Sequence, residues 1–169
     1  MVLKSSLLSK PITSKFLINE IFKTFAKTKD FNRYSNLFEV VEVTEDKLVT
    51  RININEEISS QFQSVNTGFY MYAADNITGI DISRRGPVIH VTTSLSLQIY
   101  DQTNIKDVFY FSSKFRGLLD NLVSVDFEIF NENRDYIFAR GTHTKYILKG
   151  PSIQEMIEMH LKIQSTKRE

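Results

Sequence analysis

The sequence predicts an α+β fold, in which an antiparallel sheet wraps around a central helix and extra helices stand at both ends. Two observations predict this fold. Apolar residues recur at helical spacing near the N-terminus, in the middle of the chain and near the C-terminus, and through most of the remaining chain they alternate with polar residues. A chain of 169 residues has the length of a single domain that buries most of its apolar surface.

The N-terminal third of the chain predicts one helix and one β-hairpin. Phe16, Ile21, Phe22 and Phe25 recur at helical spacing, which predicts an amphipathic helix over about 15–28. Two runs of period two follow on either side of a turn, and their apolar positions are Leu37, Val41 and Val43, then Leu48, Ile52 and Ile54.

The middle of the chain predicts the central helix, over about 66–85. Its apolar side chains form one buried stripe when the chain is wound at 100° per residue, and these are Phe69, Ala73, Ile77 and Ile80. Asn66 is a suitable N-cap, and Gly86 with Pro87 ends the helix.

The second half predicts three or four antiparallel strands and a last helix. The apolar faces of the first three strands consist of Val91, Thr93, Leu95, Leu97 and Ile99, then Phe109, Phe111 and Phe115, then Val123, Val125, Phe127 and Ile129. A fourth strand is expected over about 135–148. Ser152 and Glu155 have the spacing of a capping box, which predicts a helix whose apolar face consists of Ile153, Met156, Ile157 and Leu161.

The composition excludes several classes of function. Lys and Arg total 21 and Asp and Glu total 20, so a formal charge of +1 provides no basic surface for a nucleic acid or an anionic membrane. Without cysteine there is no disulfide, thiolate zinc site or thiol nucleophile. His90, His143 and His160 stand far apart, no window is apolar enough for a membrane span, and no phosphate-binding loop is present. We therefore expect no metal, no cofactor, no nucleic acid and no membrane-spanning helix.

Residues 1–15 have a composition of their own. Lys4, Lys10 and Lys15 stand among serines and threonines, without an acidic residue and without Arg. This pattern is compatible with a mitochondrial targeting segment and equally with a flexible arm. We expect a mitochondrial or a cytoplasmic protein, with the mitochondrial location slightly favoured.

Asp75 is the acidic residue that the sequence singles out. It falls about 150° from the buried stripe of the central helix, beside Met71, Thr78 and Ile82, so this second face is expected to meet another surface, such as a second subunit. A partly desolvated Asp there would have the raised pKa that suits a general base, whereas an ordinary surface Asp is the alternative.

Two further features are weaker signals. The amides of Thr67 and Gly68 are expected to point outward behind the N-cap, where they could stabilise an oxyanion, although nearly every helix has such amides. Thr92 and Ser94 are expected to share one polar strand face with His90 and by themselves are ordinary strand hydroxyls.

Three segments of the chain resemble the PaaI-like family of hotdog-fold acyl-CoA thioesterases. They are residues 27–31, similar to the exit of the family's first helix, residues 75–77 with 85–86, similar to the end of its central helix, and residues 139–145, similar to its last strand. The last segment, Ala-Arg-Gly-Thr-His-Thr-Lys, is the most specific. The resemblance runs over about 21–148.

This resemblance implies a hotdog domain over 16–150, between an arm at 1–15 and a helical extension at 151–169. It also implies a homodimer or a dimer of dimers. The family's active site lies between two subunits and hydrolyses an acyl-CoA thioester with water, without a metal or a covalent intermediate.

The resemblance assigns roles to particular residues. Asp75 matches the family's catalytic acid, and Thr92 matches a strand Ser. Asn66, Thr67 and Gly68 stand where the family has His-Gly-Gly, so the Thr67 amide would polarise the thioester carbonyl, while Asn66 cannot accept a proton near neutral pH. Ser60 stands in place of an upstream Asn, and the implied substrate-binding residues are Ser60, Gly68, His143 and Lys145.

Two hypotheses follow, with a different hotdog chemistry such as a dehydratase as a third. The first is an acyl-CoA thioesterase that acts on a fatty acyl-CoA through water activated by Asp75. The second is a catalytically impaired hotdog protein that binds acyl-CoA or serves as an assembly subunit. The altered helix entry supports the second hypothesis, together with bulky side chains that would fill an acyl tunnel, namely Phe69, Tyr70, Met71 and Tyr72.

Overall fold

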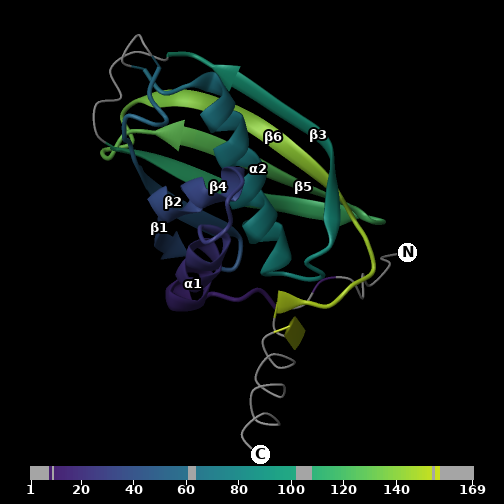
Figure 1. Ribbon diagram of the computed structural model, residues 1–169. Helices are drawn as coiled ribbons and strands as arrows, with labels where there is room; N and C mark the ends of the chain where they lie inside the picture. The colour runs from purple at the N-terminus through teal and green to yellow at the C-terminus, as the bar shows by residue number, and fades with distance from the viewer. Residues whose placement is uncertain (1–7, 9, 61–63, 102–107, 154, 157–169) are drawn as a thin grey trace, which may run out of the picture.

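The computed structural model describes residues 8, 10–60, 64–101, 108–153, 155 and 156. A six-stranded antiparallel sheet curves around one long helix, α2, while a shorter helix, α1, lies beside β1 (Figure 1). The elements are α1 (Lys15–Phe25), the 3-10 helix η1 (Phe31–Leu37), β1 (Phe38–Val43), β2 (Lys47–Asn53), α2 (Thr67–Ser83), β3 (His90–Ile99), β4 (Val108–Leu119), β5 (Leu122–Phe130) and β6 (Ile137–Ile147). The strand order is β1-β2-β4-β5-β6-β3, which places β3 at one edge of the sheet. The predicted α+β class is confirmed.

The buried stripe of α2 is confirmed, and it lies against the sheet. Its four predicted residues are almost completely buried, and Asn66 caps the helix with its side-chain oxygen, which accepts a hydrogen bond from the Gly68 amide. The second face of α2 also packs within the same chain. Thr78 and Ile82 are fully buried there, and Ile82 packs in a cluster with Val123, Val125 and Ile147. This face therefore meets another surface as expected, and for Thr78 and Ile82 that surface lies within the same chain, while Asp75 remains half exposed.

Because of a β-bulge, the buried residues of β1 differ from those that the sequence predicts. The register between β1 and β2 shifts between Val40 and Glu42, so the alternation of inward and outward side chains changes phase within the strand. Phe38 and Val40 are buried in place of the expected Val41, and Leu37 belongs to η1, a 3-10 helix that the sequence pattern did not predict.

A second bulge, in β3, has more consequence for the site. The register between β3 and β6 shifts between Thr92 and Ser94. His90 and Thr92 therefore face α2 together with Leu95, while Ser94 points to the opposite face. His90, Thr92 and Ser94 therefore do not share one polar face as expected. The inward face of β3 carries polar side chains at its start and apolar side chains after the bulge.

Val91 and Thr93, expected on the apolar face of β3, are exposed, whereas the predictions for β4, β5 and the capping box agree with the structure. The inward residues of β5 are buried, and those of β4 are buried up to Phe115, which is partly covered. Ser152 and Glu155 form the expected capping box, with Ser152 N–H donating to Glu155 Oε2 at 2.7 Å and Glu155 N–H donating to Ser152 Oγ at 3.2 Å. Most of the expected N-terminal arm, and Ile157, His160 and Leu161 of the expected last helix, lie outside the described residues. Among the described helices, none combines the length and the apolar composition that crossing a membrane requires.

Candidate functional site

Four polar side chains from three elements meet at the middle of α2. The Lys145 ammonium of β6 donates to Asp75 Oδ1 of α2 at 2.8 Å, and the Thr92 hydroxyl of β3 donates to the same oxygen at 2.9 Å. Lys145 also donates to Thr92 Oγ1 at 3.2 Å. The ring of His143, from β6, places Nε2 3.0 Å from Thr92 Oγ1 and 3.5 Å from Asp75 Oδ1. We call these four residues the Asp75 cluster.

Strand register explains why these residues converge. Thr92 lies directly opposite Lys145 in the β3–β6 ladder, so their side chains point to the same face of the sheet. The bulge after Thr92 directs this pair toward α2, where Asp75 faces it. His143 is two residues before Lys145 on the same strand and therefore shares its face.

The ionisation of Asp75 differs from the expectation. Burial raises the pKa of Asp75, but the Lys145 ammonium, the Thr92 hydroxyl and His143 outweigh burial and hold this pKa below its ordinary value. The expected raised pKa is therefore corrected, because the sequence pattern did not reveal a lysine 70 residues away in the chain. Asp75 is a carboxylate at neutral pH and remains 49% exposed, which leaves it open to a water molecule or a substrate.

His143 is the buried member of the Asp75 cluster, on the side away from solvent. It is fully buried, with Nδ1 2.5 Å from the hydroxyl of Thr78 and Nε2 near Thr92, so hydroxyl groups fix the ring at both nitrogens. Burial, together with the nearby Lys145 charge, lowers the pKa of His143 to about 4. The imidazole is therefore neutral near pH 7 and orients Thr92, while its ring does not reach the adjacent cavity.

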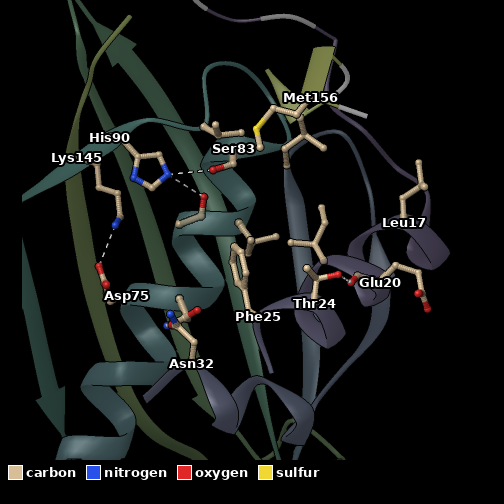
Figure 2. A pocket seen from close by; sticks show the side chains of 16 residues that line it. Leu17, Glu20, Thr24, Phe25, Asn32, Asp75, Ser83, His90, Lys145 and Met156 are labelled. Carbon is tan, nitrogen blue, oxygen red and sulfur yellow. Dashed lines mark hydrogen bonds and ion pairs between the residues drawn. The ribbon is translucent and has the colours of Figure 1, made fainter. Parts of the chain in front are cut away.

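A cavity of about 840 Å³ opens beside the Asp75 cluster. Asp75, Lys145 and His90 stand on one side of it, and Leu17 and Glu20 of α1 on the opposite side, with Phe25 between them (Figure 2). Its lining comes from α1, α2, the start of β3, β6 and residues after β6, and most of it is apolar. This volume lies within the range of about 300–1,000 Å³ that is usual for small-molecule sites.

The other sequence-predicted residues gather at the start of α2. Ser60 Oγ lies 2.8 Å from Ser64 Oγ in the turn before the helix, and Asn66, Thr67 and Gly68 form the helix entry. The Gly68 amide donates to Asn66 Oδ1 at 2.8 Å, so it does not point outward unpaired as expected. Thr67 precedes Asp75 by eight residues, about 12 Å along the helix axis. Within one chain, the helix entry and the Asp75 cluster are two separate places.

Two residues of the site, Thr78 and His90, have no role among the candidates from the sequence, although the sequence places Thr78 beside Asp75 and His90 on the strand of Thr92. Thr78, which holds His143, follows Asp75 by three residues and therefore lies on the same face of α2. His90 lines the cavity, with Nε2 3.0 Å from Ser83 Oγ and 3.3 Å from the carbonyl oxygen of Gly79. Thr78 could have been found from its helical spacing to Asp75, whereas the position of His90 depends on the bulge in β3.

The bulky residues at the start of α2 do not fill the cavity. Phe69 and Tyr70 are buried in the core, where both rings contact Phe109 of β4 edge to face. Tyr72 packs against Phe38 of β1. None of the four residues at positions 69–72 lines the cavity beside Asp75.

Among the described residues, no three His, Cys, Asp or Glu side chains are arranged to hold a metal ion.

Several solved structures have the same fold as this chain. Thioesterase superfamily member 2 from zebra fish is 17% identical, with a TM-score of 0.75, and the match covers 81% of this chain and 100% of that chain. The PaaI protein of the E. coli phenylacetic acid degradation operon is 14% identical, with a TM-score of 0.64, covering 81% of this chain and 98% of that chain. A Streptococcus mutans protein bound to acetyl CoA is 14% identical, with a TM-score of 0.63, covering 75% of this chain and 97% of that chain.

These similarities establish the fold. The chain has the hotdog fold, with the six-stranded antiparallel sheet wrapped around α2, as the resemblance in its sequence implies. Neither a protein-family model nor a curated protein matches the sequence.

Proposed function

We propose that this protein hydrolyses the thioester of a fatty acyl-CoA, with Asp75 activating the attacking water. One observation carries the proposal: a half-exposed carboxylate, ionised at neutral pH and fixed by Lys145 and Thr92, stands at the border of a largely apolar cavity. A positioned carboxylate with an open side is the arrangement that general-base catalysis requires. The apolar cavity beside it suits the hydrocarbon part of such a substrate.

The proposed reaction uses the Asp75 cluster as follows. The oxygen of a water molecule attacks the thioester carbonyl carbon while Asp75 takes up the proton that the water loses, and the carbonyl electron pair moves onto its oxygen. The C=O bond then forms again, the C–S bond breaks, and Asp75 returns the proton to the CoA thiolate. Thr92 and Lys145 hold the carboxylate in place through both steps. A low pKa makes Asp75 a weak base, so its contribution comes mainly from position.

The developing oxyanion needs a donor, and the helix entry of a second copy supplies it in this proposal. The Thr67 amide stands at the positive end of the α2 dipole, about 12 Å from Asp75 of its own chain. Within the described residues, no strand pairs with the outer edge of β3, and residues 91–94 on it are exposed. Pairing of two β3 edges would form a homodimer, within which Thr67 of one chain would serve Asp75 of the other. A dimer of dimers is the larger assembly expected.

The solved structures of this fold support the CoA part of the proposal. Two of them are a Streptococcus mutans protein bound to acetyl CoA and a hypothetical thioesterase protein from Streptococcus pneumoniae with Coenzyme A. Coenzyme A and its acetyl thioester are therefore ligands of other proteins with this fold, and we extend this ligand class to this chain.

A second candidate function rests on the helix entry. Asn66 occupies the Gly68 amide with its own side chain, which removes one donor from any oxyanion site at this helix entry. Loss of one such donor typically costs a rate factor of about 10²–10³. The alternative is therefore a protein that binds acyl-CoA without efficient turnover, or that serves as a subunit of an assembly.

The decisive experiment measures CoA release from acyl-CoAs of increasing chain length. We expect turnover by the wild type and a loss of about 10²–10⁴ in kcat/KM for Asp75→Ala. Asp126→Ala is the matched control. Like Asp75, Asp126 pairs with one basic side chain, here Arg116, and with one threonine, here Thr142, but it stands on the outer face of the sheet. Equal turnover by wild type and Asp75→Ala would contradict the proposed mechanism. No turnover by the folded wild type on any chain length would favour the binding protein.

A further inference from the structure

The helix α1 carries a second apolar face, beside the one that is buried in the core. Ile18 and Phe22 are almost completely buried, and Phe22 stacks edge to face on Phe38 of β1. Leu17, Ile21 and Phe25, at intervals of four residues, line the cavity, and Ile21 also packs against the core. These three side chains keep part of their surface exposed, and Phe25 is 37% exposed. An apolar occupant of the cavity would remove this surface from water.

Another wall of the cavity consists of the segment that follows β6. Ile153 and Met156 line the cavity there, next to Val88. The Val88 amide donates to the carbonyl oxygen of Pro151 at 3.0 Å, and Pro87 forms an antiparallel bridge with Ser152. The capping box of Ser152 then starts the helical turn that directs Ile153 and Met156 toward the cavity. Backbone and side-chain hydrogen bonds therefore hold this wall in place.

The polar groups of the cavity differ between its two sides. Glu20 and Thr24, on the α1 side, have partners within their own helix, Lys23 for the Glu20 carboxylate and the Glu20 carbonyl oxygen for the Thr24 hydroxyl. Asp75, Lys145 and His90 stand on one side, and the cavity continues from them past Phe25 to Leu17 (Figure 2). A ligand that matches this distribution has one polar reacting group and a long apolar tail. A neutral thioester tolerates the Asp75 carboxylate beside it, whereas a free fatty acid would bring a second carboxylate against it.

We propose that the acyl chain of the substrate lies in this cavity between α1 and the segment after β6, and that Leu17, on the side away from Asp75, and Met156 set the chain length that the site accepts. This inference rests on the proposed thioester hydrolysis for its polar end, and it adds the acyl subsite and its length-determining residues. Burial of each further methylene strengthens binding about fourfold until the chain reaches the end of the cavity. Chain-length preference is therefore a property of these walls.

The ratio of the kcat/KM values for a long-chain and a short-chain substrate tests the acyl subsite. The measured quantity is kcat/KM for dodecanoyl-CoA divided by kcat/KM for butyryl-CoA, in wild type, Met156→Asp and Leu17→Asp. A carboxylate in either wall opposes burial of a long tail, so the ratio falls at least about tenfold in both variants. Leu119→Asp is the matched control, because Leu119 is 74% exposed on β4 and does not line the cavity, and its ratio stays at the wild-type value. A wild-type ratio in both cavity variants, each verified as folded, would overturn the subsite.

A binding measurement separates this inference from the proposed hydrolysis. Calorimetry with the thioethers S-dodecyl-CoA and S-butyl-CoA reports the chain preference without any turnover. In one outcome no acyl-CoA is hydrolysed, but the dodecyl thioether binds more tightly than the butyl thioether and Met156→Asp removes that preference. This outcome supports the acyl subsite and contradicts the proposed hydrolysis. If acyl-CoA is hydrolysed while both thioethers bind equally well to the wild type, the proposed hydrolysis is supported and the acyl subsite is contradicted.

Discussion

Two aspartates on α2, only six residues apart, have opposite environments. Asp81 is fully buried, with Oδ1 2.6 Å from Arg84 Nε and 3.2 Å from Arg85 Nη2, while Ser113 donates to Oδ2 at 2.5 Å. Asp75 is half exposed and its polar partners leave one side open to a cavity. A closed set of partners stabilises the fold, whereas an open carboxylate beside a cavity is available for chemistry.

The Asp81 network also joins α2 to distant parts of the chain. The guanidinium of Arg84 donates to the carbonyl oxygens of Ile12, Glu45 and Lys47, so the end of α2 is tied to the N-terminal segment and the β1–β2 turn. These contacts satisfy a charge that would otherwise be buried without a partner. The comparison predicts that mutations at Asp81 act on stability and mutations at Asp75 act on turnover.

The largest effect on stability is expected for Asp81→Ala. Removal of this carboxylate leaves Arg84 and Arg85 buried without their counter-charge, which costs about 3–5 kcal/mol of the free energy of unfolding. Urea denaturation measures this loss. Asp126→Ala removes a partly exposed carboxylate and should cost less than about 1 kcal/mol. Equal losses in the two variants would show that the Asp81 network does not stabilise the fold.

The next effect is a pH dependence of stability that arises from His143. In the unfolded chain His143 is protonated below about pH 6.5. In the folded protein its pKa is about 4, so the ring stays neutral until the pH approaches that value. The free energy of unfolding therefore falls as pH decreases from 6.5 to 4, by about 2–3 kcal/mol at pH 4.5 for this one group.

Urea denaturation at several pH values should show a smaller decrease in His143→Gln than in the wild type. The comparison with this variant is needed because burial also lowers the pKa of His90, which contributes in the same direction. Parallel curves for wild type and variant would contradict the buried, neutral state of His143.

A third prediction concerns the charge that keeps Asp75 ionised. In Lys145→Met the burial of Asp75 remains while the ammonium is lost, so the pKa of Asp75 rises and the acid limb of the kcat/KM profile moves to higher pH. In the wild type this limb lies in the acidic range, because the pKa of Asp75 is below its ordinary value. An acid limb at the same pH in both proteins would remove Lys145 from this role.

The smallest effect is expected at the helix entry. Asn66→Ala removes the cap of α2 and should cost about 1 kcal/mol of the free energy of unfolding. Asn66→Asp keeps an acceptor for the Gly68 amide, so its stability should stay near that of the wild type. If Asn66→Ala is as stable as Asn66→Asp, the cap contributes nothing.

Features that depend on neighbouring residues could be predicted from the sequence. The α2 stripe, its Asn66 cap and the Ser152–Glu155 capping box all follow from local spacing, and the structure has each of them. The inward residues of β5 also agree, because that strand has no bulge within the predicted residues 123–129. Local pattern is sufficient where the period of the chain is uninterrupted.

The arrangement of the site could be predicted only in part. Asp75 was a candidate from its place on the helix, but the partners that set its pKa depend on the register that places Thr92 opposite Lys145. The bulge after Thr92 inverts the face that alternation alone assigns, and no residue pattern there announces it. For the same reason the two histidines of the site, His90 and His143, seemed unrelated in the sequence.

The most direct test of the account is the turnover of Asp75→Asn, which keeps the size of the side chain and removes its charge. CoA release from dodecanoyl-CoA is measured for this variant and for the wild type at neutral pH, after circular dichroism has verified that both are folded. The account predicts a fall in kcat/KM of about 10²–10⁴ in the variant. Wild-type turnover by Asp75→Asn would contradict it, because the open carboxylate on α2 would then have no part in the chemistry.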